Sequence, residues 1–198
     1  GGFDNGECDV GTWTDIEQVA AGGAHTLGLQ SDGTIIATGG NWYDQCNVET
    51  WTEIVYVAAG TEHSVGVKSN GTVLAVGSNF NNECEVSAWT DIVQVAAGYG
   101  YTVGLKSDGT VVAVGDTSEN GPCDVTTWTD IVQVAADNSY NCCHYTVGLK
   151  SDGTVVATGN NWNNECDVTA WTNITQVAAG GCRTFGLKTD GTVVFTGA

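Results

Sequence analysis

Several residue types are scarce in this chain of 198 residues, and their scarcity excludes whole classes of protein. It contains 5 Lys and Arg residues against 23 Asp and Glu residues, which gives a formal net charge of −18. Nucleic acids and anionic membrane surfaces both attract basic faces, so this charge argues against either as a partner. No apolar run approaches the roughly 18 residues that a membrane-spanning helix needs. We therefore expect no nucleic acid partner and no membrane insertion.

The chain also has no Met and a single Pro, and it begins with Gly-Gly. We interpret it as a processed or excised product from which any targeting signal has been removed. The 28 Gly residues are typical of a turn-rich chain, and a hydrophobic content of 41% is enough for a buried core. We predict a single domain over residues 1–198, a length that suits one ordinary domain.

A repeat runs through the whole sequence. The string Trp-Thr-[Asp/Glu/Asn]-Ile occurs five times, at spacings of 38, 38, 39 and 43 residues, beginning at Trp13, Trp51, Trp89, Trp128 and Trp171. The last copy has only 28 residues, and residues 1–12 supply the segment that it lacks. The sequence therefore predicts five repeats, over residues 13–50, 51–88, 89–127, 128–170, and 171–198 together with 1–12.

Each repeat is expected to form four antiparallel strands, as its third copy illustrates. Gln94–Ala97 is a short first strand, and Tyr101–Lys106 is a second with alternating apolar residues. Asp108-Gly109 predicts a tight hairpin with a type I′ turn. Val111–Val114 is rich in β-branched residues, which favours a third strand buried on both faces. Cys123–Val125 then forms the fourth strand.

Four strands in about 40 residues are typical of a propeller blade. The small Val-Ala-Ala strand would lie nearest the axis, where bulky side chains from five sheets would collide. If residues 8–10 form the outer strand of the C-terminal blade, the two ends close the ring and leave no exposed sheet edge. We therefore predict an all-β, closed five-bladed β-propeller of four-stranded antiparallel blades. The alternative is an open five-repeat piece of a larger ring.

The repeat also resembles that of a known family. The stretch from Val19 to Gly39, VAAGGAHTLGLQSDGTIIATG, resembles the repeat of the regulator of chromosome condensation family. The following Gly-x-Asn and Cys-x-Val segments are similar to its bacterial branch. This resemblance covers the whole chain and implies a β-propeller. The functions that it implies are diverse: nucleotide exchange on a small GTPase, chromatin docking, and inhibition of β-lactamases by secreted propellers.

Two sets of connections vary among the five copies, while the hairpin turn stays constant. The loops between the first and second strands and those after the third strand should leave from the same end of each blade, so they would share one face. All four lysines occupy one repeat position beside the constant turn: Lys68, Lys106, Lys150 and Lys188. The variable face would therefore be acidic and aromatic, which suits a basic protein, a cation or a sugar.

Nine residues of this variable face are candidates for binding. They are Phe3, Trp42, Tyr43, Phe80, Tyr99, Tyr101, Tyr140, Trp162 and Arg183. A structural interpretation stands beside this one, in which the aromatic side chains cover the outer part of each blade.

The leading functional hypothesis is a non-enzymatic scaffold, secreted or displayed at the cell surface. Its acidic face would contact a protein partner, or copies of itself in an extracellular assembly. The alternative is a lectin-like carbohydrate-binding module with one sugar site per blade, in which Phe3, Trp42, Phe80 and Trp162 stack on sugars. The sequence contains no paired nucleophile and base and no glycine loop for phosphate, so we predict no enzyme activity and no cofactor.

The eight cysteines fall into two groups. Five share one repeat position, which places them beyond the roughly 7 Å Cα separation that a disulfide allows, and we interpret them as small buried hydrophobes: Cys8, Cys46, Cys84, Cys123 and Cys166. Cys142 and Cys143 lie in an insertion of the fourth copy, and Cys182 lies in the matching loop of the fifth. A disulfide from Cys182 to one of the two is predicted, with a vicinal bridge or free thiols as alternatives. Such a bridge would indicate an oxidising compartment.

Other candidate sites are weaker. Cys143, His144 and Cys182 lack the spacing of a zinc site, and the Ser-Asp-Gly-Thr string is explained by its hairpin without calcium, so we predict no metal. Asn70 and Asn173 match the N-glycosylation pattern. His25 and His63 share a repeat position that elsewhere holds Tyr or Arg, which argues against a catalytic role.

Overall fold

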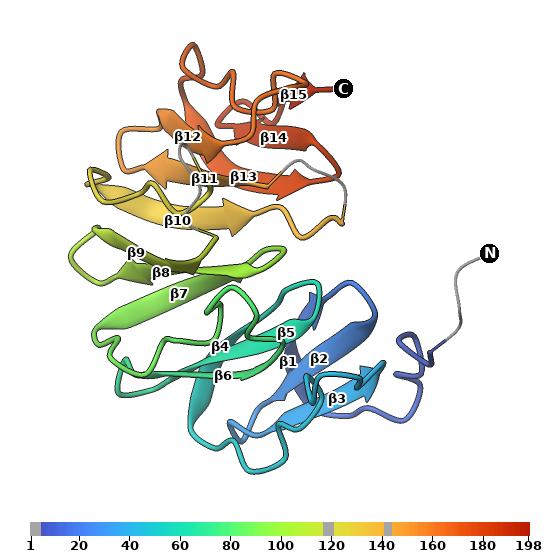
Figure 1. Ribbon diagram of the computed structural model, residues 1–198. Helices are drawn as coiled ribbons and strands as arrows, with labels where there is room; N and C mark the ends of the chain where they lie inside the picture. Colours follow the sequence, from blue (N-terminus) through green and yellow to red (C-terminus); the bar gives the residue numbers. More distant parts are fainter. Residues whose placement is uncertain (1–4, 117–120, 141–143) are drawn as a thin grey trace.

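The structure is a computed structural model that describes residues 5–116, 121–140 and 144–198. Fifteen β-strands in these ranges form five three-stranded sheets, with no helix among them, and the sheets follow one another in an arc (Figure 1). We call them blades 1 to 5. Blades 1 and 2 contain β1 (Ile16–Ala21), β2 (His25–Gln30), β3 (Ile35–Gly39), β4 (Ile54–Ala59), β5 (His63–Lys68) and β6 (Val73–Gly77). Blades 3 to 5 contain β7 (Ile92–Ala97), β8 (Tyr101–Lys106), β9 (Val111–Gly115), β10 (Ile131–Ala136), β11 (Tyr145–Lys150), β12 (Val155–Gly159), β13 (Ile174–Gly180), β14 (Arg183–Lys188) and β15 (Val193–Gly197).

Each blade is an antiparallel meander of three strands in chain order. The all-β class and the five repeats are therefore confirmed, but the predicted fourth strand is wrong. The Cys-x-Val segment satisfies its backbone locally: Cys46 N donates to Asn41 Oδ1 at 2.8 Å, and Val48 N donates to Cys46 O at 2.9 Å. The buried Val48 side chain packs into the core while its backbone follows a turn, so no ladder forms.

The hairpin between the second and third strands is present in every blade, although its turn is not type I′. In blade 3, Gly109 has a φ of 81° and donates to Lys106 O at 3.0 Å. Asp108 is not in the left-handed region, and its Oδ1 accepts hydrogen bonds from Thr110 N at 2.9 Å and Thr110 Oγ1 at 2.6 Å. This is a three-residue loop with one left-handed glycine. These hydrogen bonds also lower the pKa of the Asp108 carboxyl.

The first strand of each blade lies innermost, as its small side chains predicted. A central channel is lined by β1, β4, β7, β10 and β13, and the alanines of the Val-Ala-Ala strands lie along it. A glutamine of this strand joins each of three blades to the next. Gln18 Nε2 donates to Val57 O at 2.9 Å, and Val57 N donates back to Gln18 Oε1 at 3.0 Å. The same pair of bonds links Gln133 to Val177.

In blades 2 to 4 the middle strand, and not the third as predicted, is the one buried on both faces. Its central glycine receives an indole ring. Trp51 packs against Gly66 of β5 and belongs to a core cluster that also contains Leu27 and Leu29 of blade 1. Each tryptophan of the Trp-Thr string meets a glycine in this way, in the pairs Trp13–Gly28, Trp51–Gly66, Trp89–Gly104, Trp128–Gly148 and Trp171–Gly186.

The predicted closure by the N-terminal segment is not found. Residues 5–12 lie on blade 1, where Glu7 O accepts a hydrogen bond from Thr26 Oγ1 at 2.7 Å. Gln45 O accepts in the same way from Ser64 Oγ at 2.6 Å, so each such segment belongs to the blade that follows it in sequence. Because residues 5–12 pack on blade 1, they are not available to complete blade 5.

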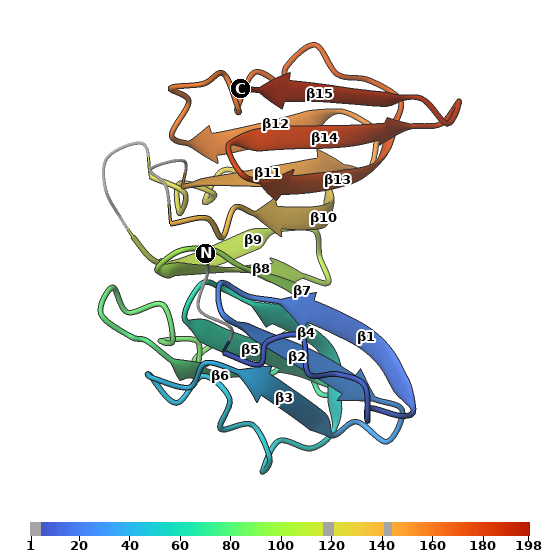
Figure 2. The same ribbon diagram turned by 90° about the vertical axis from the view of Figure 1, so that its right-hand side faces the viewer.

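The two ends of the arc lie apart (Figures 1 and 2). On blade 5, Val193 and Phe195 are 60% and 64% exposed, whereas Val155, the equivalent of Val193 in blade 4, is 4% exposed. On blade 1, Val19 is 63% exposed, whereas the equivalent Val57 is 1% exposed. Each terminal blade thus has a neighbour on one side only.

The tryptophan and glycine contact predicts the effect of adding one methyl group. In Gly104→Ala, the new Cβ would lie 2.7 Å from Cζ3 of Trp89, in a core that cannot yield without repacking two blades. We expect a loss of about 1–3 kcal/mol in the free energy of unfolding, measured by urea denaturation. Gly11→Ala is the matched control, because no atom lies within 4 Å of its Cβ position. Equal stability of the two variants would contradict the proposed role of the contact.

Candidate functional site

The two variable sets of loops do lie together at one end of the blades. Ser78 N, after β6, donates to Glu62 O, before β5, at 2.9 Å, and Gly40 N donates to Ala24 O at 2.7 Å in blade 1. The lysines lie at the opposite end, where Lys68 Nζ is 3.0 Å from an oxygen of Glu53. We call the end that carries the variable loops the loop face.

The insertion of the fourth repeat crosses the central channel on this face. Its described residues are Asp137 to Tyr140 and His144. Asn138 Nδ2 donates to Ala21 O of blade 1 at 3.2 Å, and Asn138 O accepts a hydrogen bond from Thr61 Oγ1 of blade 2. A loop that starts in blade 4 is thus fixed to blades 1 and 2.

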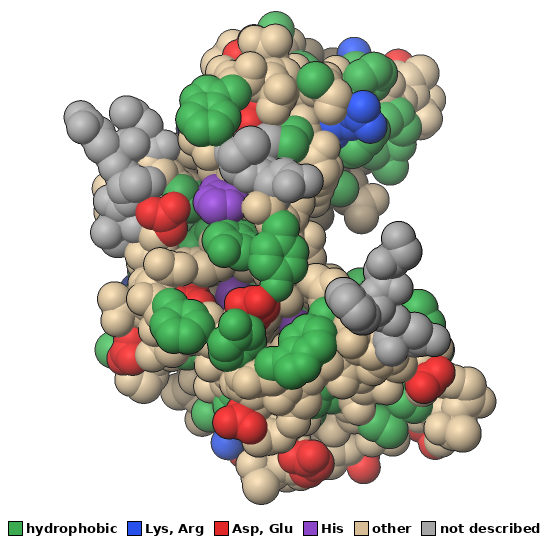
Figure 3. All heavy atoms as spheres, turned by 45° about the vertical axis from the view of Figure 1, so that its right-hand side comes forward, with side chains coloured by type: hydrophobic (Ala, Val, Ile, Leu, Met, Phe, Trp, Pro, Cys, Tyr) green, Lys and Arg blue, Asp and Glu red, His purple; other side chains and the backbone are tan. Residues whose placement is uncertain are grey.

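This crossing brings aromatic side chains and a carboxylate into one cluster. The Tyr140 hydroxyl donates to Glu62 Oε1, 78 residues away in sequence. Tyr99 lies between two rings, with its centroid 5.3 Å from that of Tyr140 and 4.8 Å from that of His144, on which it stacks. Figure 3 shows hydrophobic side chains gathered over the middle of the molecule with carboxylates among them.

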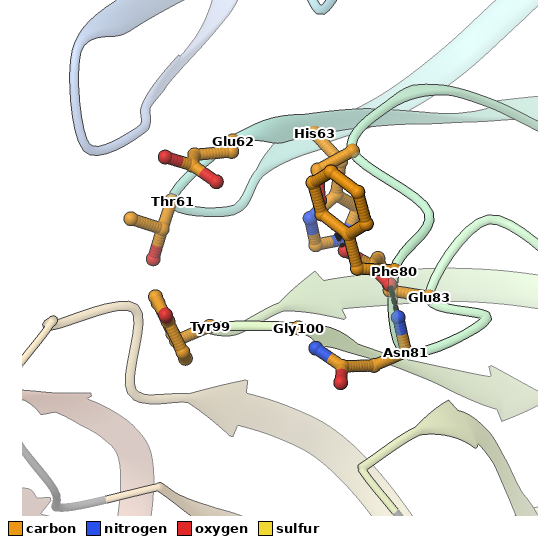
Figure 4. Close-up of a pocket in the computed structure, with 9 residues that line it drawn as sticks. Thr61, Glu62, His63, Phe80, Asn81, Glu83, Tyr99 and Gly100 are labelled. Carbon is orange, nitrogen blue, oxygen red and sulfur yellow. Dashed lines mark hydrogen bonds between the residues drawn. The ribbon is translucent and has the colours of Figure 1, made fainter. Parts of the chain in front are cut away.

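A cavity of about 230 Å³ opens beside this cluster, between blades 2 and 3. Figure 4 shows Glu62 and Thr61 on one side, Phe80 and His63 on another, and Tyr99 and Asn81 beneath. Tyr43 packs edge to face on Phe80, with ring centroids 5.7 Å apart. The rings that line the cavity are therefore supported from behind.

Glu83 forms part of the cavity wall and is 1% exposed. Its carboxylate accepts hydrogen bonds from Ser78 Oγ and from Asn81 N, both at 2.7 Å. A buried carboxylate needs such partners to offset its lost hydration. They also fix the loop that carries Phe80.

The predicted binding residues separate into four groups. Tyr43, Phe80, Tyr99 and Tyr140 join the cluster, whereas Trp42, Trp162 and Arg183 are exposed elsewhere, and Phe3 lies outside the described residues. Tyr101 is fully buried, and its hydroxyl donates to Tyr145 O at 2.6 Å. We therefore assign Tyr101 to the packing between blades.

The repeat position of Tyr101 links successive blades near the axis. His25 Nε2 is 3.0 Å from Ser64 Oγ, and His63 Nε2 is 2.8 Å from Thr102 Oγ1. Burial lowers the pKa of both histidines to about 4, so both rings are neutral at pH 7. Each ring thus joins its blade to the next one.

The five cysteines at the shared repeat position are free. Four are half-buried and Cys8 is exposed, so the prediction that all five are buried holds only in part for four of them. Desolvation raises the pKa of Cys84, Cys123 and Cys166 to about 12, which makes these thiols poor nucleophiles. Cys182 is disulfide-bonded.

The remaining predictions concern the partner of Cys182, metal binding, membrane insertion and glycosylation. Cys142 and Cys143 lie outside the described residues, so the pairing of Cys182 stays a prediction. Within residues 5–116, 121–140 and 144–198, no three His, Cys, Asp or Glu side chains are placed to hold a metal. The same ranges contain no helix long and apolar enough to cross a membrane. Asn70 and Asn173 remain predicted glycosylation sites.

Comparison with known proteins agrees with the repeat. The family model for the regulator of chromosome condensation (RCC1) repeat matches residues 16–45, 54–83 and 92–121. Each matched segment starts at the first strand of a blade and ends in the loop after the third. Three consecutive blades of this chain are thus RCC1 repeats. No curated protein matches its sequence closely enough to serve as a relative.

Several solved structures are similar to this chain in fold. Yeast RCC1 (Prp20), in its complex with Kap60, has a TM-score of 0.70 at 19% identity, over 92% of this chain and 56% of that one. Human WBSCR16 has a TM-score of 0.72 at 19% identity, over 93% and 62% of the two chains. The ectodomain of the Physcomitrella patens receptor kinase CR4 has a TM-score of 0.73 at 15% identity, over 92% and 53%. The RCC1-repeat chain thus spans between half and two thirds of the structures that it matches.

Sequence reasoning missed Glu62, His144 and Asn81 as members of the site. One signal was available for Glu62. Its repeat position holds Ala24, Gly100, His144 and Cys182 in the other copies, so a carboxylate occurs there once. A residue that departs from the repeat is not required by the packing that every blade shares. Glu62 was therefore a candidate for a specific role.

The two buried histidines predict how stability depends on pH. In the unfolded chain a histidine titrates near 6.5, whereas His25 and His63 stay neutral down to about 4. The unfolded state therefore binds more protons between these values, and stability falls as the pH is lowered through this window. We expect a loss of roughly 2 kcal/mol per histidine between pH 7 and pH 5 in urea unfolding.

His63→Tyr provides the matched variant, because Tyr101 and Tyr145 fill the same repeat position. It should lose about half as much stability over this pH range as the parent protein. The exposed aspartates with a lowered pKa, such as Asp108, affect stability only at still lower pH. An unchanged pH dependence in His63→Tyr would contradict the assignment.

Proposed function

We propose that this RCC1-repeat chain is a non-enzymatic scaffold that binds a protein partner through its loop face. The observation that carries the proposal is the composition of that face, where Tyr43, Phe80, Tyr99 and Tyr140 surround Glu62 on rigid supports. Aromatic side chains held in place and surrounded by polar groups are typical of the centres of protein interfaces. The lysines lie at the other end of the blades, so the loop face favours a basic partner.

Relatives of the same fold support a binding role. The yeast protein Prp20 has been crystallised bound to Kap60, and a second study of it concerns its binding to Gsp1p and histones. Those partners belong to that protein. For this chain we infer only that an RCC1 propeller serves as a protein-binding surface. Its partner would contribute a basic segment.

Peptide and glycan arrays test this proposal against the lectin alternative. We expect the chain to bind basic peptides in preference to acidic or neutral ones of equal length, and the signal to fall steeply as salt is raised. Tyr43→Ala with Phe80→Ala should weaken this binding about tenfold or more. Trp162→Ala is the control, because Trp162 is exposed but lies outside the cluster. Multivalent sugar binding that is lost in Trp42→Ala with Trp162→Ala would instead support a lectin.

We also propose that the protein works in an oxidising compartment, secreted or at a cell surface. The disulfide-bonded state of Cys182 supports this, because such bridges persist outside the reducing cytosol. Peptide mapping without reductant should find Cys182 joined to a peptide that contains Cys142 and Cys143. Recovery of Cys182 as a free thiol from the natively expressed protein would contradict both the pairing and the compartment.

A further inference from the structure

The cavity between blades 2 and 3 carries negative charge that this chain does not itself neutralise. Glu62 and Glu83 both line it. In the described part of the chain, one lysine forms an ion pair: Lys68 pairs with Glu53, at the opposite end of blade 2. His63 also lines the cavity, but burial lowers its pKa to about 4, so it supplies no positive charge at pH 7. A cationic group from outside would find two carboxylates without a basic partner.

The cavity also has aromatic walls suited to a cation. Phe80 is 79% exposed and is held by Tyr43 behind it. Tyr99 is held between Tyr140 and His144. Because the faces of aromatic rings attract cations, and because these rings lose little freedom on binding, they add to the attraction of the carboxylates.

Comparison of the five copies shows that this combination occurs once. In the equivalent place between blades 1 and 2, Glu62 is replaced by Ala24 and Tyr99 by Thr61. Between blades 4 and 5, they are replaced by His144 and Gly181. A feature required by the propeller itself would recur, whereas this set is specific to one position. It therefore predicts a single site.

The geometry of Glu62 indicates the kind of cation. Its Oε1 already accepts the hydroxyl of Tyr140, so a guanidinium in its preferred bidentate pairing would have to share that oxygen with the tyrosine. An ammonium is a point charge that needs one free carboxylate oxygen and can turn its remaining donors elsewhere. We propose that the cavity bounded by Glu62, Phe80 and Tyr99 binds the ammonium group of one lysine side chain of a protein partner. This rests on the proposed function and specifies its central contact.

Nuclear magnetic resonance of the whole chain tests the site directly. The backbone amide of Gly100 lies in the cavity wall and serves as the reporter, and that of Gly109, at the opposite end of blade 3, serves as the reference. The probe is a Gly-Ser peptide with one central lysine and blocked ends. We expect it to shift Gly100 and not Gly109, with a Kd of about 1 mM. Peptides with norleucine or acetyl-lysine should give no saturable shift, and an arginine peptide should bind several-fold more weakly.

Substitutions separate the cavity from the general field of an acidic protein. Glu62→Gln should weaken the lysine peptide about five- to tenfold, and Tyr99→Ala by a similar factor. Glu53→Gln removes the same charge at the lysine end, and it should leave the Kd unchanged. Far-ultraviolet circular dichroism and the spectrum away from the cavity report whether each variant is folded.

The outcomes distinguish this inference from the proposed function. Equal binding of lysine and norleucine peptides, equal weakening by Glu62→Gln and Glu53→Gln, tighter binding of arginine, or no Gly100 shift at ten times the expected Kd would each overturn the lysine site. If basic peptides on the array still bound and depended on Tyr43 and Phe80, the loop face would remain a protein-binding surface without this pocket. Loss of binding in both experiments would overturn both proposals.

Discussion

The contact between an indole ring and a bare glycine backbone determines how the blades assemble. A tryptophan from the turn before each blade lies over the glycine of that blade's middle strand, and three of the five are buried against the blade before. Each ring can approach the strand closely because glycine has no Cβ. The hydrophobic core therefore lies between blades and not within them, so a blade gains most of its stability from its neighbours. The exposed apolar residues of blades 1 and 5 are the direct consequence at the two ends of the arc.

A core of this kind leaves the loop face free to vary. The constant elements, which are the Trp-Thr string, the hairpin turn and the small inner strand, all serve contacts that recur in every blade. Residues 60–62, between β4 and β5, and residues 78–82, after β6, lie outside these core clusters. Specific chemistry can accordingly be introduced at one position, as with Glu62, without altering the packing that the other four copies share. Rigid strands then hold these loops in place, which is the usual arrangement of binding sites on repeat scaffolds.

The sequence predicts features that repeat, and it predicts poorly those that depend on a single contact. The five repeats, the strand ranges, the innermost Val-Ala-Ala strand and the common end of the variable loops all follow from periodicity. The fourth strand was wrong because Asn41 and Cys46 satisfy the backbone through a side chain and a turn, which strand patterning does not reveal. The prediction that the N-terminal segment closes the ring was wrong because the number of repeats does not show on which blade residues 5–12 pack. The cluster at Glu62 depends on Tyr140, brought there by a loop that crosses the channel, and periodicity carries no information about that path.

The same crossing loop makes the site a property of the assembled arc. Asn138 is fixed to blades 1 and 2, while the insertion begins in blade 4, so the relative positions of these three blades determine where Tyr140 meets Glu62. Tyr99, which supports one wall of the cavity, in turn stacks on His144 at the far end of that insertion. A disturbance of the packing between blades 3 and 4 would therefore move the aromatic wall away from the carboxylate, even though Glu62 itself belongs to blade 2. Stability between blades and binding on the loop face are coupled through one segment, and a variant that loosens the blades should lose ligand binding before it loses its strands.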